Sequence, residues 1–245
     1  MDRPAVVLEN EEAVYDFYLR HPQNRQVARV AYAALAQRFK PRVSYPDGAR
    51  EDLRRLIYDD TRIIIAVNHL SETDPYTVAA TAWASPLRAV IGRTRVLAKD
   101  ELFQEPKQRR RIDMMGGIPV FRGKNHGMRA VNAAGKAMMD VSAQRLQRGD
   151  DLAVFPEGTC NLEDPTKVQH VGSGLGHIVA RARERGVEPV LVCVGLSYGP
   201  GSERLKSASV YIDNPITELP AKPIAITRVV TDAMQKALDG AVAAY

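Results

Sequence analysis

The chain has 245 residues, a formal net charge of +5 and 45% hydrophobic residues, so it can bury about 70–75% of its unfolded surface in a core. Its two cysteines exclude a disulfide-stapled secreted fold and fit a reducing compartment. No run approaches the roughly 18 uninterrupted apolar residues of a spanning helix, and early acidic residues such as Glu9 and Asp16 argue against a signal peptide. We therefore expect a cytoplasmic protein without a transmembrane segment.

The first 60 residues are expected to form a helical extension. Breaks at prolines separate predicted helices over 10–20, 24–39 and 48–58. In the second of these, Val27, Val30 and Leu35 recur at helical spacing and need an apolar partner surface. We therefore expect residues 1–60 to pack on a main domain that spans 61–245.

A strand predicted over 61–67 is followed by Asn-His-Leu-Ser-Glu-Thr-Asp-Pro at 68–75. Buried strands of a parallel sheet deliver side chains to its carboxyl edge, so His69 and Asp74 are expected there. A carboxylate beside an imidazole holds one ring tautomer, which frees the other nitrogen to take a proton. The competing interpretation is structural: Asp74 followed by Pro75 is also a good helix start.

Two further strands are predicted over 87–92 and 117–121. The second lies within Gly-Gly-Ile-Pro-Val-Phe-Arg at 116–122, so Arg122 follows a short buried run. Its guanidinium fork suits a phosphate or a carboxylate, although a solvated arginine at a strand end is a common alternative.

A fourth strand, predicted over 152–155, leads into Phe-Pro-Glu-Gly-Thr at 155–159. Gly158 lets backbone amides approach a ligand closely, and Thr159 adds a hydroxyl donor. Such a turn can hold an anionic group, but it can also be a plain loop that ends a strand.

The remaining elements complete an alternating pattern. Strands are predicted over 189–196 and 208–212, and helices over 75–84, 126–147, 172–185 and 224–243. This alternation predicts an α/β fold with a mixed, largely parallel sheet flanked by helices, plus the short N-terminal helical extension. The histidines do not form ligand spacings with each other or with the cysteines, so no metal site is expected.

Taken together, the three polar segments resemble the glycerol-phosphate and lysophosphatidate (1-acylglycerol-3-phosphate) acyltransferase superfamily. That family carries His-x-x-x-x-Asp, then a glycine-rich strand ending in arginine, then Phe-Pro-Glu-Gly-Thr, in this order. The segment Lys-Asp-Glu-Leu-Phe at 99–103 is also similar to the family. The resemblance implies that His69 is the general base and Asp74 its orienting partner. It further implies that the acceptor site is lined by Arg122, Glu157, Gly158 and Thr159. Two roles stay open for Glu157: it accepts a hydrogen bond from an acceptor hydroxyl, or it fixes Arg122.

Three segments depart from the family pattern. Cys160 and Asn161 follow the Phe-Pro-Glu-Gly-Thr segment, where arginine or serine is usual, so one phosphate ligand is missing. Cys193 stands where the family's fourth segment has a central proline, and no basic residue is evident around 172–174. These departures leave the base chemistry intact and weigh against a glycerol-phosphate acceptor.

The resemblance implies transfer of a fatty acyl group from acyl-CoA or an acyl carrier protein to a hydroxyl of a lysophospholipid-type acceptor, without a cofactor. Backbone amides near Gly158, or at the helix start after Asp74, are candidate oxyanion donors. A non-phospholipid acceptor, such as a glycolipid, is the alternative, followed by a non-catalytic lipid- or carrier-binding module. Intact His69, Asp74 and Glu157 argue against the latter, because binding alone needs no base.

Positive charge is concentrated in the middle of the chain. Residues 93–136 hold eleven Lys or Arg and four Asp or Glu. The segment 107–124 within this region is expected to contact an anionic partner. The candidates are the inner face of the cell membrane, the phosphates of coenzyme A and the acidic surface of an acyl carrier protein. The alternative is that the segment is a basic surface exposed only to solvent. Nucleic acid is not expected, because interleaved aromatic residues are missing.

Overall fold

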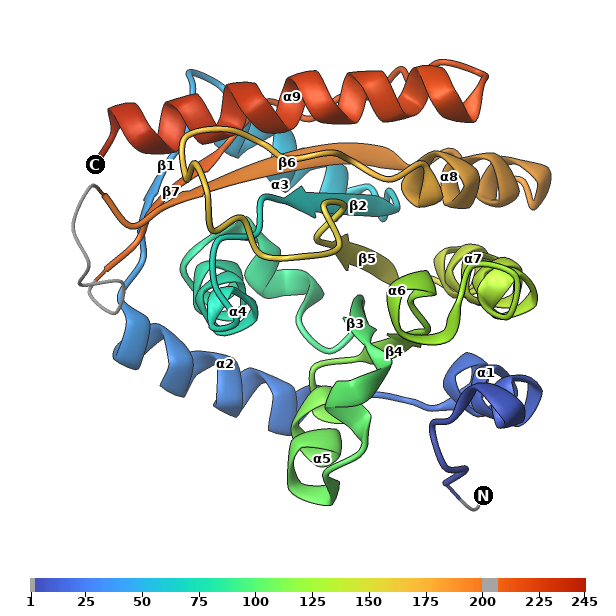
Figure 1. Cartoon of the computed structure of the whole chain (residues 1–245). Helices are drawn as coiled ribbons and strands as arrows, with labels where there is room; N and C mark the ends of the chain where they lie inside the picture. The colour runs from blue at the N-terminus through green and yellow to red at the C-terminus, as the bar shows by residue number, and fades with distance from the viewer. Residues whose placement is uncertain (1–2, 200–206) are drawn as a thin grey trace.

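The computed structural model describes residues 3–199 and 207–245, which fold around a seven-stranded sheet (Figure 1). The strand order is β1-β7-β6-β2-β5-β3-β4; β6 and β7 pair antiparallel and the other neighbours pair parallel. The strands are β1 (Arg42–Ser44), β2 (Ile63–Val67), β3 (Thr94–Lys99), β4 (Gly117–Val120), β5 (Asp151–Val154), β6 (Val190–Ser197) and β7 (Ser209–Ile212). The predicted fold class is confirmed.

Helices cover both faces of this sheet (Figure 1). The α-helices are α1 (Glu11–Arg20), α2 (Arg25–Phe39), α3 (Ala49–Tyr58), α4 (Asp74–Ala84), α5 (Pro106–Met114), α6 (Gly123–His126), α7 (Val131–Gln147), α8 (Gly174–Glu184) and α9 (Pro223–Ala243). Short 3-10 turns are η1 (Leu8–Asn10), η2 (Pro86–Val90) and η3 (Asp100–Phe103). None of the helices in the described ranges is long and apolar enough to cross a membrane.

The sequence of strand β2 is one continuous apolar run because both faces of the strand are buried. Ile64 and Ala66 face the core under α1, α7, α8 and α9, whereas Ile63, Ile65 and Val67 face the opposite core under α3 and η2. Successive side chains of a strand point to opposite faces, so a strand covered on both sides has no polar positions.

The N-terminal segment packs closely on the rest of the molecule. Helix α1 contacts α7, and α2 contacts α4, where Ala28 and Tyr32 are buried. Residues 42–44 form β1 at the sheet edge beside β7. This strand was not expected, because a three-residue, partly exposed edge strand shows no clear alternation.

The strand predicted over 87–92 is wrong. Residues 86–90 form the 3-10 turn η2, and the strand lies further on, at β3. Leu87 and Val90 are spaced by three residues, so a single helical turn buries both. The true strand was hidden because Arg95, buried within it, breaks its apolar pattern.

Candidate active site

The carboxyl ends of β2 and β5 meet at one edge of the sheet, because the two strands are parallel neighbours. We call this the carboxyl edge. His69 follows β2, and the Phe-Pro-Glu-Gly-Thr segment follows β5. Two segments that lie about ninety positions apart in the sequence therefore converge where open α/β sheets form their sites.

The imidazole of His69 is held by Asp74. Nδ1 lies 2.9 Å from Asp74 Oδ2, and the same oxygen accepts hydrogen bonds from the amides of Leu70 at 2.6 Å and Ser71 at 2.8 Å. The hydroxyl of Tyr198 donates to Oδ1 at 2.8 Å. An ionised Asp74 thus favours the proton on Nδ1, which leaves Nε2 as the proton acceptor.

The carboxylate of Asp74 does not cap the helix that it begins. The backbone amides that donate to it, those of Leu70 and Ser71, precede α4, and no side-chain cap bond is made at this helix start. Asp74 is fully buried, whereas the side chain of His69 is 17% exposed. The alternative interpretation as a helix cap therefore explains the position of Asp74 but not the direction of its carboxylate.

Glu157 is bound to the backbone on both of its oxygens. It accepts hydrogen bonds from the amides of His69 and Gln169, each at 2.8 Å. Burial raises the pKa of Glu157, and these two amides work in the opposite direction. Glu157 therefore holds the His69 loop, and Arg122 has a different carboxylate partner.

The turn after Glu157 places a thiol against the imidazole. Cys160 Sγ lies 3.5 Å from His69 Nε2, and the ring of Phe155 stacks on the imidazole with centroids 4.4 Å apart. Gly158 (φ +68°) and Thr159 are exposed in this turn. The amide of Gly158 donates to the carbonyl of Phe155 at 3.0 Å, so the turn itself uses one of the expected oxyanion donors.

The other expected oxyanion donors are also engaged. In the first turn of α4, the amides of Tyr76 and Thr77 donate to the carbonyl of Thr73 at 3.0 and 3.3 Å. An amide must exchange such a bond before it can stabilise a developing oxyanion.

Two cations lie at the ends of the next strands. Arg122, after β4, donates to Glu101 at 2.6 Å, and Lys99, at the end of β3, donates to Glu72 at 3.0 Å. The side chains are 18% and 34% exposed, respectively. The sequence interpretation left Lys99 without a role, although it begins the Lys-Asp-Glu-Leu-Phe segment.

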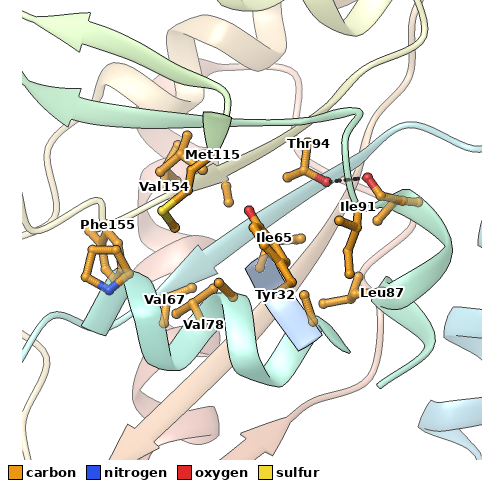
Figure 2. A pocket seen from close by; sticks show the side chains of 16 residues that line it. Tyr32, Ile65, Val67, Val78, Leu87, Ile91, Thr94, Met115, Val154 and Phe155 are labelled. Carbon is orange, nitrogen blue, oxygen red and sulfur yellow. Dashed lines mark hydrogen bonds between the residues drawn. The ribbon is translucent and has the colours of Figure 1, made fainter. Parts of the chain in front are cut away.

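An apolar pocket lies between α4 and the sheet, next to the His69 ring. It is a narrow slot with a cavity volume of about 40 Å³; the space between its atoms reaches about 550 Å³ only when the open solvent at its mouth is counted. Figure 2 shows Phe155 and Val67 towards one end and Leu87 and Ile91 towards the other. Tyr32 of α2 also lines the pocket, and burial raises the pKa of its hydroxyl to about 12.

The site brings together residues that sequence reasoning did not connect. Tyr198, Cys160 and Phe155 touch the His69–Asp74 pair, but each comes from a distant segment. The apolar run before Phe155 predicted a strand that ends near the site, whereas no motif in the sequence around Tyr198 indicated a role for this residue. Within residues 3–199 and 207–245, no group of three or more His, Cys, Asp or Glu side chains is arranged to hold a metal ion.

A largely parallel sheet with an imidazole–carboxylate pair at its carboxyl edge defines an α/β protein suited to acid–base chemistry. The chain matches the family model described as Acyltransferase over residues 45–197 and belongs to that family, which confirms the superfamily suggested by its motifs. The protein is therefore an acyltransferase.

The fold is similar to that of a solved structure, the 1-acyl-sn-glycerophosphate (LPA) acyltransferase PlsC from Thermotoga maritima. The TM-score is 0.56 at 16% sequence identity, and the match covers 96% of this chain and 89% of that chain. At this identity the likeness concerns the fold. The search of curated proteins found no significant match.

Proposed function

We propose that the protein transfers a fatty acyl group from an acyl thioester to a hydroxyl of a lysophospholipid-type acceptor. The single observation that carries this proposal is the orientation of His69. Its Nδ1 is held by a buried carboxylate, and its Nε2 faces a turn beside an apolar pocket. A base next to an apolar pocket suits a substrate with a reacting polar end and a long hydrocarbon chain.

In the proposed reaction, His69 Nε2 removes the proton of the acceptor hydroxyl while the hydroxyl oxygen adds to the thioester carbonyl. Asp74 stabilises the imidazolium that forms, and the donor thiol leaves with the proton. A positioned base contributes on the order of 10²–10⁴-fold, and orientation of the two substrates contributes the rest.

The pocket supports a fatty acyl chain as the transferred group. Its lining is mainly aliphatic and aromatic, with the hydroxyls of Tyr32 and Thr94 as polar groups, and Phe155, which lines it, stacks on the ring of the base. Each methylene that enters such a site gains about 0.8 kcal/mol. Acyl-CoA and acyl carrier protein are both suitable donors, because the pocket recognises only the chain that they share.

Lys99 and Arg122 support a phosphate on the acceptor. Each cation now pairs with a partly or largely exposed carboxylate, Glu72 or Glu101, which a phosphate can replace as partner. A lysophospholipid gains further affinity from its own acyl chain, which glycerol 3-phosphate lacks. We therefore rank lysophosphatidate-like acceptors first and glycerol 3-phosphate second.

The test is an acceptor competition. Palmitoyl-CoA is supplied with lysophosphatidate, glycerol 3-phosphate and a neutral monoacylglycerol at equal concentrations, and thiol release is followed together with product mass spectrometry. Preferential acylation of lysophosphatidate is expected. Preferential acylation of glycerol 3-phosphate reverses the ranking, and acylation of the neutral acceptor alone points to a non-phospholipid substrate.

The basic segment supports a peripheral contact with anionic membrane. Lys107, Arg110 and Arg111 are exposed on α5. Arg109 instead turns inward, where it donates to the carbonyl of Pro4 at 2.8 Å and its side chain is only 12% exposed. The proposed membrane contact therefore rests on the three exposed cations and not on the whole run.

A further inference from the structure

Tyr198 is brought to the His69 loop by the strand order. It directly follows β6, which lies beside β2 in the sheet and runs parallel to it, so both residues come to the carboxyl edge. The side chain of Asn68 continues this pairing beyond β2. It donates to the carbonyl of Leu196 at 3.1 Å and accepts from the amide of the same residue at 2.7 Å. The two strand ends are therefore clamped together one residue before His69 and two residues before Tyr198.

The hydroxyl of Tyr198 lies between two side chains of α4. Its oxygen is 2.8 Å from Asp74 Oδ1 and 2.9 Å from Thr77 Oγ1. These two residues are three positions apart in the helix and share one face of it. An ionised carboxylate can only accept, so the single hydroxyl proton of Tyr198 goes to Asp74, and Thr77 donates to the Tyr198 oxygen. All three side chains are buried, so these hydrogen bonds are shielded from water.

The two oxygens of Asp74 have different partners. Oδ2 accepts from His69 Nδ1 and from the amides of Leu70 and Ser71, whereas Tyr198 donates to Oδ1. A carboxylate can turn about its Cβ–Cγ bond, and donors on both oxygens stop this rotation. Because Asp74 has no exposed surface, Oδ1 cannot turn to bulk water when the Tyr198 hydroxyl is removed. The hydroxyl thus helps to keep Oδ2 against the imidazole.

We propose that Tyr198 is a positioning residue for acyl transfer, which acts through Asp74 on His69. This inference deepens the proposed function and rests on it. The Tyr198 hydroxyl keeps Asp74 Oδ2 on Nδ1, so the imidazole carries its proton there and presents Nε2 to the acceptor hydroxyl. When the imidazolium forms, the same hydrogen bond keeps the negative charge of Asp74 beside it. Tyr198 transfers no proton itself.

The chain offers a matched control in another part of the fold. Tyr18 of α1 donates to Asp113 Oδ1 of α5 at 3.0 Å, and both side chains are buried. Asp113 pairs with the guanidinium groups of Arg3 and Arg109, at 3.6 and 3.9 Å. Tyr18→Phe therefore removes a buried bond from a phenol to a carboxylate, as Tyr198→Phe does, but from a carboxylate that lies away from the His69 loop.

The first experiment compares the kinetics of the two variants. Tyr198→Phe keeps the aromatic ring and removes only the hydroxyl. We expect kcat with palmitoyl-CoA and lysophosphatidate to fall about tenfold, the equivalent of one charge-assisted hydrogen bond, while both KM values stay unchanged. Tyr18→Phe should keep the wild-type kcat. Both variants should lower the melting temperature by a similar amount, because each loses one buried hydrogen bond.

The second experiment reads the imidazole directly. Histidine labelled with a heavy nitrogen isotope is incorporated, and NMR of the ring nitrogens is recorded at mildly alkaline pH, where imidazoles are neutral. The spectrum of His69→Ala assigns the His69 signals. Wild-type protein should carry the His69 proton on Nδ1, and Tyr198→Phe should lower the share of this tautomer. Thr77→Val, which removes the donor to Tyr198, should act in the same direction but more weakly, whereas Tyr18→Phe should leave the signals unchanged.

The proposal is overturned if Tyr198→Phe lowers kcat by less than about threefold. It is also overturned if kcat falls while the ring-nitrogen signals of His69 stay unchanged, because Tyr198 then acts on the fold or the substrates. If Tyr198→Phe does not fold, unchanged His69 signals in Thr77→Val overturn it as well. If wild-type protein acylates none of the acceptors tested, the proposed function fails, whereas the ring-nitrogen spectra still decide whether Tyr198 controls the tautomer of His69.

Discussion

Buried carboxylates lie at both ends of the parallel strands, at the carboxyl edge and at the opposite, amino edge, but their partners differ. At the amino edge, where β3 and β5 begin, Asp150 accepts from Arg95 at 2.7 Å and from Arg145 at 2.5 Å. At the carboxyl edge, Asp74 accepts from amides, a hydroxyl and an imidazole. An arginine stays charged, so the first arrangement holds the chain together, whereas an imidazole can exchange its proton at neutral pH.

The difference shows that burial of an acid does not by itself indicate catalysis. Burial raises the pKa of Asp150, and the arginines only partly offset this effect. Asp151, which accepts from the amide of Ile63 at 2.9 Å, has its pKa raised to about 6, mainly by burial. Both acids lie at the start of β5, whereas Phe155 and the His69 loop follow the other ends of β5 and β2. What distinguishes Asp74 is its titratable, partly exposed partner.

The largest expected effect is at the carboxyl edge. His69→Ala should lower kcat for acyl transfer by at least about 100-fold, because the reaction loses its base. The melting temperature should change little, since the His69 side chain is partly exposed and lies in a loop. Thiol-release assays and thermal unfolding measure both quantities, and residual activity within tenfold of wild type would remove the assignment.

The substitution Asp74→Asn tests the second member of the His69–Asp74 pair. It should also lower kcat severely, because an amide does not hold the imidazole tautomer. It should in addition cost stability, since Asp74 is fully buried and accepts several hydrogen bonds. Loss of stability without loss of kcat would make Asp74 a structural acid like Asp150.

The next effect belongs to the amino edge and should appear in stability alone. Asp150→Ala leaves the buried guanidinium of Arg95 unpaired, which costs about 3–5 kcal/mol in the free energy of unfolding. The melting temperature should fall by roughly 10 °C for a domain of this size. Activity per folded molecule should stay at the wild-type value; a fall in kcat equal to that of His69→Ala would erase the contrast between the two edges.

A smaller effect is expected from the cations beside the site. Arg122→Ala and Lys99→Ala should each raise KM for a phosphate-bearing acceptor by about tenfold, the equivalent of one charge-assisted contact. The KM for palmitoyl-CoA should stay unchanged. If only the donor KM rises, these cations bind coenzyme A phosphates, and the acceptor lies elsewhere. Arg183→Ala, which removes a surface ion pair with Glu188, is a control of equal charge change.

The smallest effect concerns surface charge. Wild-type protein should sediment with anionic phosphatidylglycerol vesicles at low salt and be released at physiological ionic strength, where charges are screened over about 8 Å. Replacing Lys107, Arg110 and Arg111 with glutamine should weaken this binding. Replacing the inward-facing Arg109 should instead lower stability. Equal sedimentation with neutral vesicles would argue against an electrostatic contact.

Sequence reasoning worked where a property is local. The apolar run over 63–67 and the His-x-x-x-x-Asp segment after it lie within a dozen residues, so the strand and the His69–Asp74 pair were predictable together. The alternation of strands and helices likewise indicated the α/β class. The prediction of a strand over 87–92 failed, because a short apolar stretch fits a strand and a helical turn equally well.

The sequence by itself therefore determined the α/β alternation of most elements, the two site segments and the family to which they belong. Only the tertiary structure decided which residues meet. It placed Glu157 on the amide of His69, Lys99 on Glu72 and Cys160 against Nε2, because the strand order puts β2, β5 and β3 side by side although they are separated along the chain. Contacts of this kind depend on through-space distances across neighbouring strands, which spacing along the sequence does not encode.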